Sequence, residues 1–265
     1  MKRNADRQQG GSRLNVQMLG TGSAFAKAFH NNNALFTLNG QTLLVDCGIT
    51  APKSLYELGI TFDKIDAVLL THIHADHIGG LEEFGFQMKF IYKRKPKLFI
   101  ADTLVETLWE CSLKGGMYQD EMPSLESYFD VYPMAEGTAY EVIPGLRIKL
   151  IQTSHIPNKP NYSLIINDHF FYSGDMVFSS DLLHSLVEEQ DIRLIFHDCQ
   201  LHPPGVVHAC LSQLLTLPPD IQRITHLMHY GDNQPEFIGR TGLMTFIDQH
   251  VKYEIDPLTF ALNRL

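Results

Sequence analysis

The chain has 265 residues, which is long enough for one large α/β domain with a buried core. Hydrophobic residues make up 44% and charged residues 19% of it, a balance typical of globular proteins and not of disordered or fibrous ones. The formal net charge of −9 argues against a broad surface for nucleic acid, because such surfaces gain affinity from basic residues that displace counterions from phosphates.

The start of the chain is polar and has no apolar core of a secretory signal, so we expect a flexible tail over residues 1–13. A single domain over residues 14–265 is expected to follow. No apolar run reaches the roughly 18 residues that a membrane span requires. The four cysteines lie far apart without the spacing of a metal site, as expected for reduced thiols. These features predict a cytoplasmic protein that does not interact with membranes. The cysteines are Cys47, Cys111, Cys199 and Cys210.

Short apolar or β-branched runs predict strands, and helical patterns alternate with many of them. Asn39-Gly40 and Asn167-Asp168 each separate two such runs, and these residue types tolerate the positive φ of tight hairpin turns. The interleaving favours an α/β fold with a sheet core and helices outside. Gly115-Gly116 predict a loop within 85–140, for which a lid, a dimer contact and a surface excursion are the alternatives. The expected strands cover 15–19, 34–38, 41–46, 67–71, 97–100, 146–152, 162–166, 169–173, 192–197 and 224–228, and the expected helices cover 52–58, 103–113, 181–189, 209–215 and 234–249.

The strongest chemical signal directly follows the strand expected over 67–71. His72, His74, Asp76 and His77 occur there within six residues. In an extended loop, residues two apart point to the same side, so His72 and His74 can converge on one ion while Asp76 and His77 reach a second. Imidazole nitrogen and carboxylate oxygen are ordinary zinc ligands. The segment therefore predicts a metal site, with zinc as the first choice and manganese as the second. A chance cluster of solvated residues is the alternative, and the density of the cluster argues against it.

The pattern HxHxDH after an apolar strand resembles the signature of the metallo-β-lactamase superfamily. Three later segments resemble further motifs of that family in the expected order: Thr153-Ser154-His155, Phe171 to Asp175, and His226 to Tyr230. The resemblance implies an α/β fold of the αβ/βα four-layer sandwich type, with two zinc ions per chain (manganese as the alternative). It assigns one metal ion to His72, His74 and His155 and the other to Asp76, His77 and His229, with Asp175 bridging them.

The last of these ligands has a competitor three residues away. His226 and His229 both lie near the end of the run expected as a strand over 224–228. We prefer His229, because it follows the complete apolar run and metal sites favour the loops that follow strands.

Other features resemble the ribonuclease Z branch of the superfamily. Leu19 to Ala24 resemble its glycine-rich opening loop, Asp198 stands where that branch has the glutamate of its HEAT motif, and His208 stands where it has a histidine that opens a helix. The resemblance implies that Asp198 orients His208, which then assists the departing oxygen; an unrelated pair is the alternative. Members that process tRNA carry a long basic arm after the histidine matched by His155. Here that arm is missing, because Ile156 to Pro160 lead directly into the next expected strand.

Compact relatives without the arm include the anti-Pycsar cyclic nucleotide phosphodiesterases, which this overall pattern resembles. The resemblance implies a homodimer that hydrolyses 3′,5′-cyclic nucleotides, such as cyclic CMP and cyclic UMP, and thereby counteracts an antiphage signal. Asp76 is then expected to position the attacking water, which two metal ions activate. The alternatives are a ribonuclease Z-type RNA 3′-end endonuclease and a protein that sequesters a nucleotide without cutting it. Binding of tRNA would need a substitute grip such as Lys89 to Lys97, for which a solvated turn is the favoured interpretation.

Overall fold

The computed structural model describes residues 13–265. The predicted flexible tail therefore lies outside the described residues, apart from its last residue. Arg13 is exposed and forms an ion pair with Glu254 near the other end of the chain.

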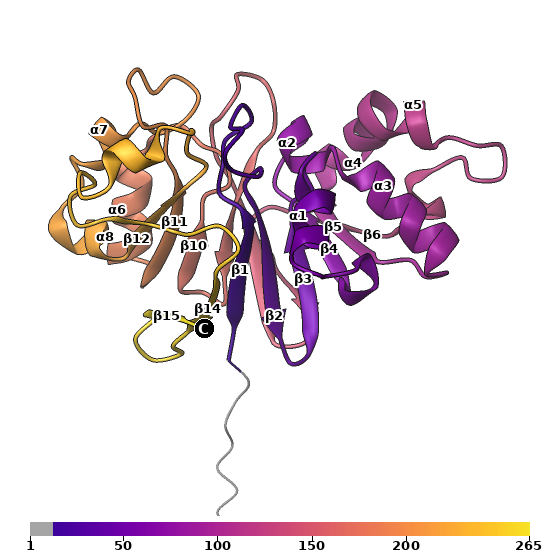
Figure 1. Ribbon diagram of the computed structural model, residues 1–265, viewed down its shortest axis with the longest axis horizontal. Helices are drawn as coiled ribbons and strands as arrows, with labels where there is room; N and C mark the ends of the chain where they lie inside the picture. The colour runs from indigo at the N-terminus through magenta and orange to yellow at the C-terminus, as the bar shows by residue number, and fades with distance from the viewer. Residues whose placement is uncertain (1–12) are drawn as a thin grey trace, which may run out of the picture.

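Two mixed β-sheets form the centre of the molecule (Figure 1). Within residues 13–265, the first sheet has eight strands in the order β15-β14-β1-β2-β3-β4-β5-β6, and the second has seven in the order β13-β12-β11-β10-β9-β8-β7. The strands of the first sheet are β1 Asn15–Gly20, β2 Asn33–Leu38, β3 Gln41–Val45, β4 Ala67–Leu70, β5 Lys97–Ala101, β6 Asp130–Met134, β14 Lys252–Ile255 and β15 Leu262–Arg264. Those of the second are β7 Ala139–Ile143, β8 Leu146–Gln152, β9 Tyr162–Ile166, β10 Phe170–Tyr172, β11 Leu194–Asp198, β12 Thr225–Met228 and β13 Thr245–Phe246.

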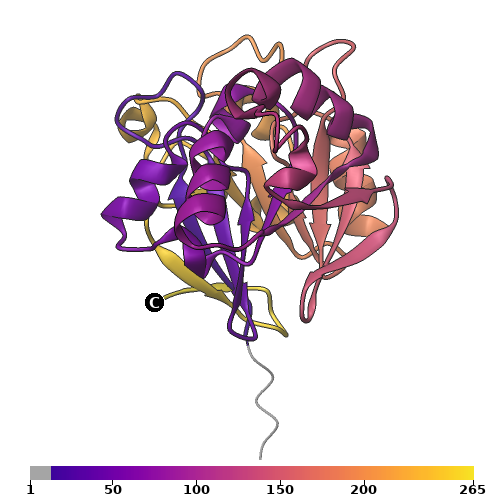
Figure 2. The same ribbon diagram turned by 90° about the vertical axis from the view of Figure 1, so that its right-hand side faces the viewer.

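Helices cover the outer face of each sheet, on the right for the first sheet and on the left for the second in Figure 1. Figure 2, turned by 90°, shows the helices of the first sheet in front of their strands. The predicted αβ/βα four-layer sandwich is therefore confirmed. The helices are α1 Ala51–Glu57, α2 Ala75–Ile78, α3 Leu81–Phe86, α4 Asp102–Leu108 and α5 Lys114–Met117 beside the first sheet, and α6 Ser180–Glu188, α7 Leu211–Leu214 and α8 Pro219–Arg223 beside the second.

The two predicted hairpin turns are present. Asn39 and Gly40 join β2 to β3 with φ of 53° and 76°, and Asn167 and Asp168 join β9 to β10 with φ of 46° and 66°. Consecutive positive φ values characterise the turn whose twist matches that of the flanking strands. The residue types at these positions therefore fix where each hairpin folds back.

The main apolar core lies between the two sheets. The ring of Phe36 on β2 packs against Phe170 and Tyr172 on β10, with centroids 6.0 and 6.2 Å apart. Strand β11 serves two layers, because Phe196 belongs to this core while Ile195 faces a second apolar cluster that includes Leu183 of α6. A strand buried on both faces reads as a continuous apolar run, which is why LIF in β11 shows no alternation. Burial of one such side chain contributes roughly 1.5–3 kcal/mol.

Two local predictions are wrong. The segment 234–249 is not a helix: it contains a short 3₁₀ turn at Gln234–Phe237 and the strand β13. Gly239 and Gly242 adopt φ of 75° and 65° there, a left-handed conformation that interrupts a helix. Gly115-Gly116 lie in the short helix α5 and not in a loop.

The basic segment Lys89 to Lys97 is tied down by neighbouring groups. Arg94 donates to the carbonyl oxygen of Asp63 at 2.7 Å and pairs with Asp66, and Lys95 pairs with Asp130 at 3.7 Å. These contacts connect the turn before β5 to the adjacent elements. The favoured interpretation as a turn holds only for residues 92–96, because Lys89 lies in the short helical segment Gln87–Ile91 and Lys97 begins β5. The ion pairs leave fewer charges of the segment free for phosphates.

Candidate metal centre

The loop after β4 brings the local histidine cluster to the carboxyl end of the first sheet. His72 and His74 precede α2, and Asp76 and His77 lie in the first turn of that short helix. His72 Nε2 and His74 Nδ1 are 2.9 Å apart, so their ring nitrogens converge as the sequence predicts. The chain becomes helical at Ala75, where an extended loop had been expected, and the His77 ring lies beside that of His72 with centroids 4.0 Å apart.

The second sheet supplies the other predicted residues from the ends of three strands. His155 follows β8, Asp175 follows β10, and His229 immediately follows β12. His229 adopts φ of 56°, a left-handed conformation that is costly for a residue with a side chain and often occurs at functional sites. The carboxyl ends of neighbouring strands are the usual position of ligand sites in α/β sheets.

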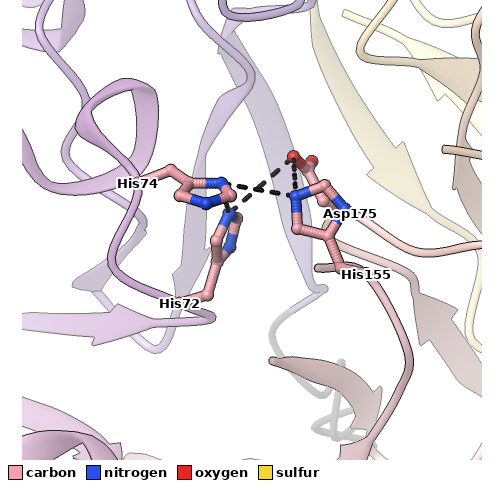
Figure 3. A group of neighbouring side chains, drawn as sticks. All are labelled: His72, His74, His155 and Asp175. Atoms are coloured by element: carbon pink, nitrogen blue, oxygen red, sulfur yellow. Dashed lines mark hydrogen bonds and ion pairs between the residues drawn. The ribbon is translucent and has the colours of Figure 1, made fainter. Parts of the chain in front are cut away.

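Two groups of these side chains could each hold a metal ion. Within each group, one ligand atom from every residue lies within 4.8 Å of the others. Figure 3 shows the first group, in which His72 and His74 from one sheet face His155 and Asp175 from the other. Asp175 belongs to both groups. The first consists of His72, His74, His155 and Asp175, and the second of Asp76, His77, Asp175 and His229.

Asp175 stands at the junction of the two groups. Its Oδ2 atom lies 3.8 Å from His72 Nε2 and 3.3 Å from His77 Nε2, whereas its Oδ1 atom lies 3.4 Å from His229 Nε2. The side chain is buried. All seven predicted residues are thus brought together, and the predicted bridging position of Asp175 is the one in contact with both groups.

The donor atoms of this cluster fit a metal ion better than they fit one another. His77 Nε2 and Asp175 Oδ1 are buried and have no hydrogen-bond partner among the described residues. An unpaired buried polar atom is costly, and a mixed set of imidazole nitrogens and carboxylate oxygens suits zinc and similar divalent ions. A divalent cation would satisfy these atoms.

The pKa shifts of most members favour the protonation states that bind a metal ion, namely a neutral imidazole and an ionised carboxylate. Burial, with the nearby His77, lowers the pKa of His72 well below its ordinary value, so this ring is neutral at pH 7. Burial alone would raise the pKa of Asp175, but His229 and His77 hold it well below its usual range. For His77, burial opposes protonation while Asp175, Asp46 and Asp76 raise the pKa well above the usual value. A cation near His77 Nε2 would oppose that protonation, because metal and proton compete for the same lone pair.

Asp46 is a site residue that the sequence analysis did not identify. It directly follows β3 and has φ of 60°, and its Oδ2 atom accepts a hydrogen bond from His77 Nδ1 at 2.8 Å. Thr71 donates to the same carboxylate through its backbone N–H and its hydroxyl group. A carboxylate that holds one imidazole nitrogen fixes the tautomer and turns the other nitrogen toward a metal. The position of Asp46 at the end of the apolar run 41–46 was the signal available from the sequence.

Asp198 and His208 lie together as predicted. His208 Nδ1 is 3.0 Å from Asp198 Oδ2 and 3.9 Å from Asp175 Oδ2. Burial lowers the pKa of His208, but the hydrogen bond and charge of Asp198 raise it on balance above the ordinary value of a histidine. His208 also stacks on His229, with centroids 4.7 Å apart. The pair therefore borders the second group of the cluster.

Two cavities share lining residues with the cluster. One of about 320 Å³ is lined by His208, His229 and the 88% exposed ring of Phe25. Another of about 820 Å³ is lined by His155 and Lys159 among others. Both volumes lie within the range of small-molecule sites.

The competing histidine lies outside the cluster. His226 contacts Thr245 Oγ1 at 2.7 Å through its Nδ1 atom and belongs to neither group. Of the two histidines, His229 therefore has the geometry of a ligand.

Within residues 13–265, no helix is both long and apolar enough to cross a membrane.

Comparison with solved structures places the fold. A metallo-β-lactamase fold protein, YhfI from Bacillus subtilis, superposes with a TM-score of 0.71 at 19% sequence identity and covers 91% of this chain and 99% of its own. The chain therefore has the metallo-β-lactamase fold, and its buried His/Asp cluster has the donors to hold metal ions.

Comparison with families gives a more specific result. The family model described as Anti-Pycsar protein Apyc1 matches residues 14–253. An Anti-Pycsar protein Apyc1 from Paenibacillus harenae is 57% identical over 242 residues, which is 91% of this chain and 100% of that relative. Another from Bacillus phage BSP38 is 42% identical over 252 residues, with 90% and 97% covered. The chain belongs to the Anti-Pycsar protein Apyc1 family.

Proposed function

We propose that the chain is a two-metal phosphodiesterase that hydrolyses 3′,5′-cyclic nucleotides to nucleoside monophosphates and thereby counteracts an antiphage signal. Membership in the Anti-Pycsar protein Apyc1 family supports the biological role. Cyclic CMP and cyclic UMP are the first substrates to test. Zinc is the first candidate metal and manganese the second, given the imidazole and carboxylate ligands.

The contacts that Asp175 makes with both donor groups are the main support for this proposal. One carboxylate lies within 4 Å of histidines from both groups, at 3.8 Å from His72 Nε2 and 3.4 Å from His229 Nε2. A mononuclear site would not need a second complete set of donors. We therefore infer two metal ions, one held by His72, His74 and His155 and the other by Asp76, His77 and His229, with Asp175 shared between them.

Each part of the site then has a chemical task. Two bound divalent ions lower the pKa of water and stabilise charge on phosphoryl oxygens. Asp76 lies 3.4 Å from His229 Nε2 and 3.3 Å from His77 Nε2. Burial would raise its pKa, but His77 and His229 hold it far below the usual range, so it is ionised. In that form Asp76 accepts a hydrogen bond from the attacking water and orients it.

Asp198 and His208 assist the leaving group in this mechanism. Asp198 is buried and holds His208 Nδ1 at 3.0 Å, which leaves Nε2 as the atom that can deliver a proton. As the water oxygen bonds to phosphorus, it gives up one proton to Asp76, and the bond from phosphorus to the ribose oxygen breaks. His208 Nε2 protonates that oxygen, and the product is a linear nucleoside monophosphate.

The short connection after His155 and the surface charge favour a small diester over folded RNA as the substrate. Only residues 153–161 connect β8 to β9, so no long arm leaves the protein after His155. Several charges of Lys89 to Lys97 pair with acidic neighbours. Together with the net charge of −9, these features leave little to bind a tRNA backbone.

A substrate panel tests the proposal against both alternatives. The purified protein, loaded with zinc or manganese, is offered cyclic CMP, cyclic UMP, cyclic AMP, cyclic GMP and a tRNA precursor. We expect linear monophosphate from one or more cyclic nucleotides and an intact precursor. Cleavage of the precursor without turnover of any cyclic nucleotide would identify an RNA endonuclease instead.

A second measurement addresses the sequestering alternative. We expect Asp76→Ala to abolish product formation, while Asp120→Asn, at an exposed position in the loop after α5, keeps it. Wild-type protein that binds a cyclic nucleotide and releases no product, with binding unchanged by Asp76→Ala, would identify a nucleotide-sequestering protein. A homodimer is also expected, and sedimentation of the same samples measures it.

A further inference from the structure

A second cluster of metal-type donors lies apart from the candidate metal centre. His30, Glu57 and His250 each offer a ligand atom within 4.8 Å of the other two, and none of them belongs to the groups around Asp175. His30 Nε2 is 2.9 Å from Glu57 Oε2, and the rings of His30 and His250 are stacked with centroids 5.6 Å apart. The three residues come from the loop between β1 and β2, from α1 and from the segment before β14.

Neighbouring contacts hold the backbone of His30 and the ring of His250 in place. The backbone N–H of His30 donates to Gln249 Oε1 at 2.7 Å, and His250 Nε2 lies 2.9 Å from Ser54 Oγ on α1. His250 has a φ of 65°, a left-handed conformation that tertiary contacts must maintain. The loop at His30 and the imidazole of His250 are thus positioned before any ligand arrives.

We propose that His30, Glu57 and His250 form a separate zinc site that fastens the loop between β1 and β2 to α1 and to the segment before β14.

The donor set and its spacing suit this ion. Two imidazole nitrogens and one carboxylate oxygen form a common zinc triad, with a fourth position left for water. Zinc bonds near 2.1 Å place tetrahedral ligands about 3.4 Å apart, and His30 Nε2 and Glu57 Oε2 are already 2.9 Å apart. The Glu57 side chain is 39% exposed, so it can adjust. Burial and the neighbouring His30 lower the pKa of His250, which keeps a lone pair available.

The loop that this site would fasten also contacts the candidate metal centre. Ser23 N–H donates to the carbonyl oxygen of Tyr230 at 2.9 Å, and Tyr230 N–H donates to Thr21 O at 3.0 Å. Tyr230 directly follows His229. An ion at His30 would therefore stiffen the loop that supports His229 and would help to fix that residue in its strained conformation.

A matched pair elsewhere on the surface provides the control. His184 and Glu188 on α6 form a histidine–glutamate contact at 3.2 Å and belong to no group of three donors among the described residues. Glu57→Gln removes the charge from the proposed site, and Glu188→Gln removes it from the isolated pair. His250→Asn is a second variant, because asparagine tolerates a positive φ.

Zinc content distinguishes the variants without reference to any substrate. The intact protein is saturated with zinc, dialysed against buffer without metal, and analysed by mass spectrometry for zinc per chain. We expect Glu57→Gln and His250→Asn each to hold one equivalent less than wild type and Glu188→Gln to hold the wild-type amount. Equal zinc in all four proteins would refute the site. Because the result is a difference in bound metal, it stands or falls independently of the proposed hydrolysis of cyclic nucleotides.

Hydrogen exchange tests the role given to the site. Added zinc should slow exchange of the amides in residues 21–32 more in wild type and in Glu188→Gln than in Glu57→Gln. The same protection in Glu57→Gln as in wild type would contradict the fastening role.

Discussion

The two sheets contribute to the metal centre in different ways. The first sheet supplies four side chains from a single loop, His72 to His77, within six consecutive positions. The second supplies His155, Asp175 and His229, which are separated by 20 and 54 positions in the sequence. They meet because the parallel strands β8, β10 and β12 all have their carboxyl ends at the same end of the sheet. A local cluster can be recognised from spacing alone, whereas a distributed one depends on the strand order.

The difference implies different sensitivities to mutation. Residues of the local loop are held by their immediate surroundings, namely Asp46, Thr71 and the tight packing beneath α2. Those of the second sheet are held by sheet registration, and one of them, Asp175, touches both groups. We therefore expect the shared residue of the second sheet to matter most and the supports of the local loop to have graded effects.

Loss of the shared carboxylate should have the largest effect. Asp175→Asn removes the negative charge that both donor groups contact, so we expect a fall in turnover of at least roughly 10²- to 10³-fold together with the loss of bound metal. Turnover of the best cyclic nucleotide and zinc content measure it. Asp120→Asn, at an exposed position, is the control; retention of full metal content by Asp175→Asn would remove the bridging role.

A methyl group beneath the local loop should have the next largest effect. A Cβ atom at Gly48 would lie 1.8 Å from the carbonyl oxygen of Asp76, so Gly48→Ala must displace the backbone that carries Asp76 and His77. A shift of about 1 Å can cost roughly 10²-fold in rate, and we expect a loss of that order in kcat.

The control for this substitution is another glycine. Gly115 on α5 has open space where a Cβ atom would be placed, so Gly115→Ala should leave the rate unchanged. Unchanged kinetics in Gly48→Ala would show that the backbone at Asp76 can move without affecting catalysis.

Removal of the carboxylate behind His77 should have a moderate effect. Asp46 accepts hydrogen bonds from His77 and Thr71, and an asparagine amide must present its NH₂ group to one of these donors. The tautomer of His77 with a free Nε2 lone pair is thereby disfavoured. We expect Asp46→Asn to weaken metal binding by about 10- to 100-fold, measured by competition with a chromogenic chelator. Wild-type affinity would mean that the ring is oriented without Asp46.

The smallest effect is expected at the near neighbour of the last ligand. His226 contacts Thr245 and lies outside both donor groups. Because His226→Gln removes no donor from either group, it should retain metal content and keep turnover within about twofold. His229→Gln should lose metal from the second group. The reverse outcome, metal loss only in His226→Gln, would exchange the two assignments.

Much of the fold was predictable because its central strands are strongly apolar. The runs at 67–71, 162–166 and 192–197 correspond to β4, β9 and β11, which are fully buried. Strands β6 and β15, at two sheet edges, were missed, since an edge strand has one solvated side and its polar residues obscure the pattern. The false helix over 234–249 combined helical composition with two glycines whose conformation only the tertiary structure reveals.

The site was predictable to a similar extent. The loop His72 to His77 follows from spacing alone, whereas His155, Asp175 and His229 required a family resemblance to select them from 13 histidines and 30 acidic residues. Asp46 and the cluster of His30, Glu57 and His250 were missed. The members of that cluster are brought together by tertiary packing, and no local pattern marks them.

The pairing of β1 with β14 has a consequence for how the protein is made. On the ribosome, Asn15 to Gly20 emerge early, yet the partner strand Lys252–Ile255 emerges some 230 residues later. Contacts between distant parts of a chain slow folding, because a long loop must close before they form. The β1 side of the first sheet therefore stays unpaired through most of synthesis. The nascent chain consequently exposes an apolar strand to which chaperones can bind, and the first sheet can be completed only after almost the whole chain has been synthesised.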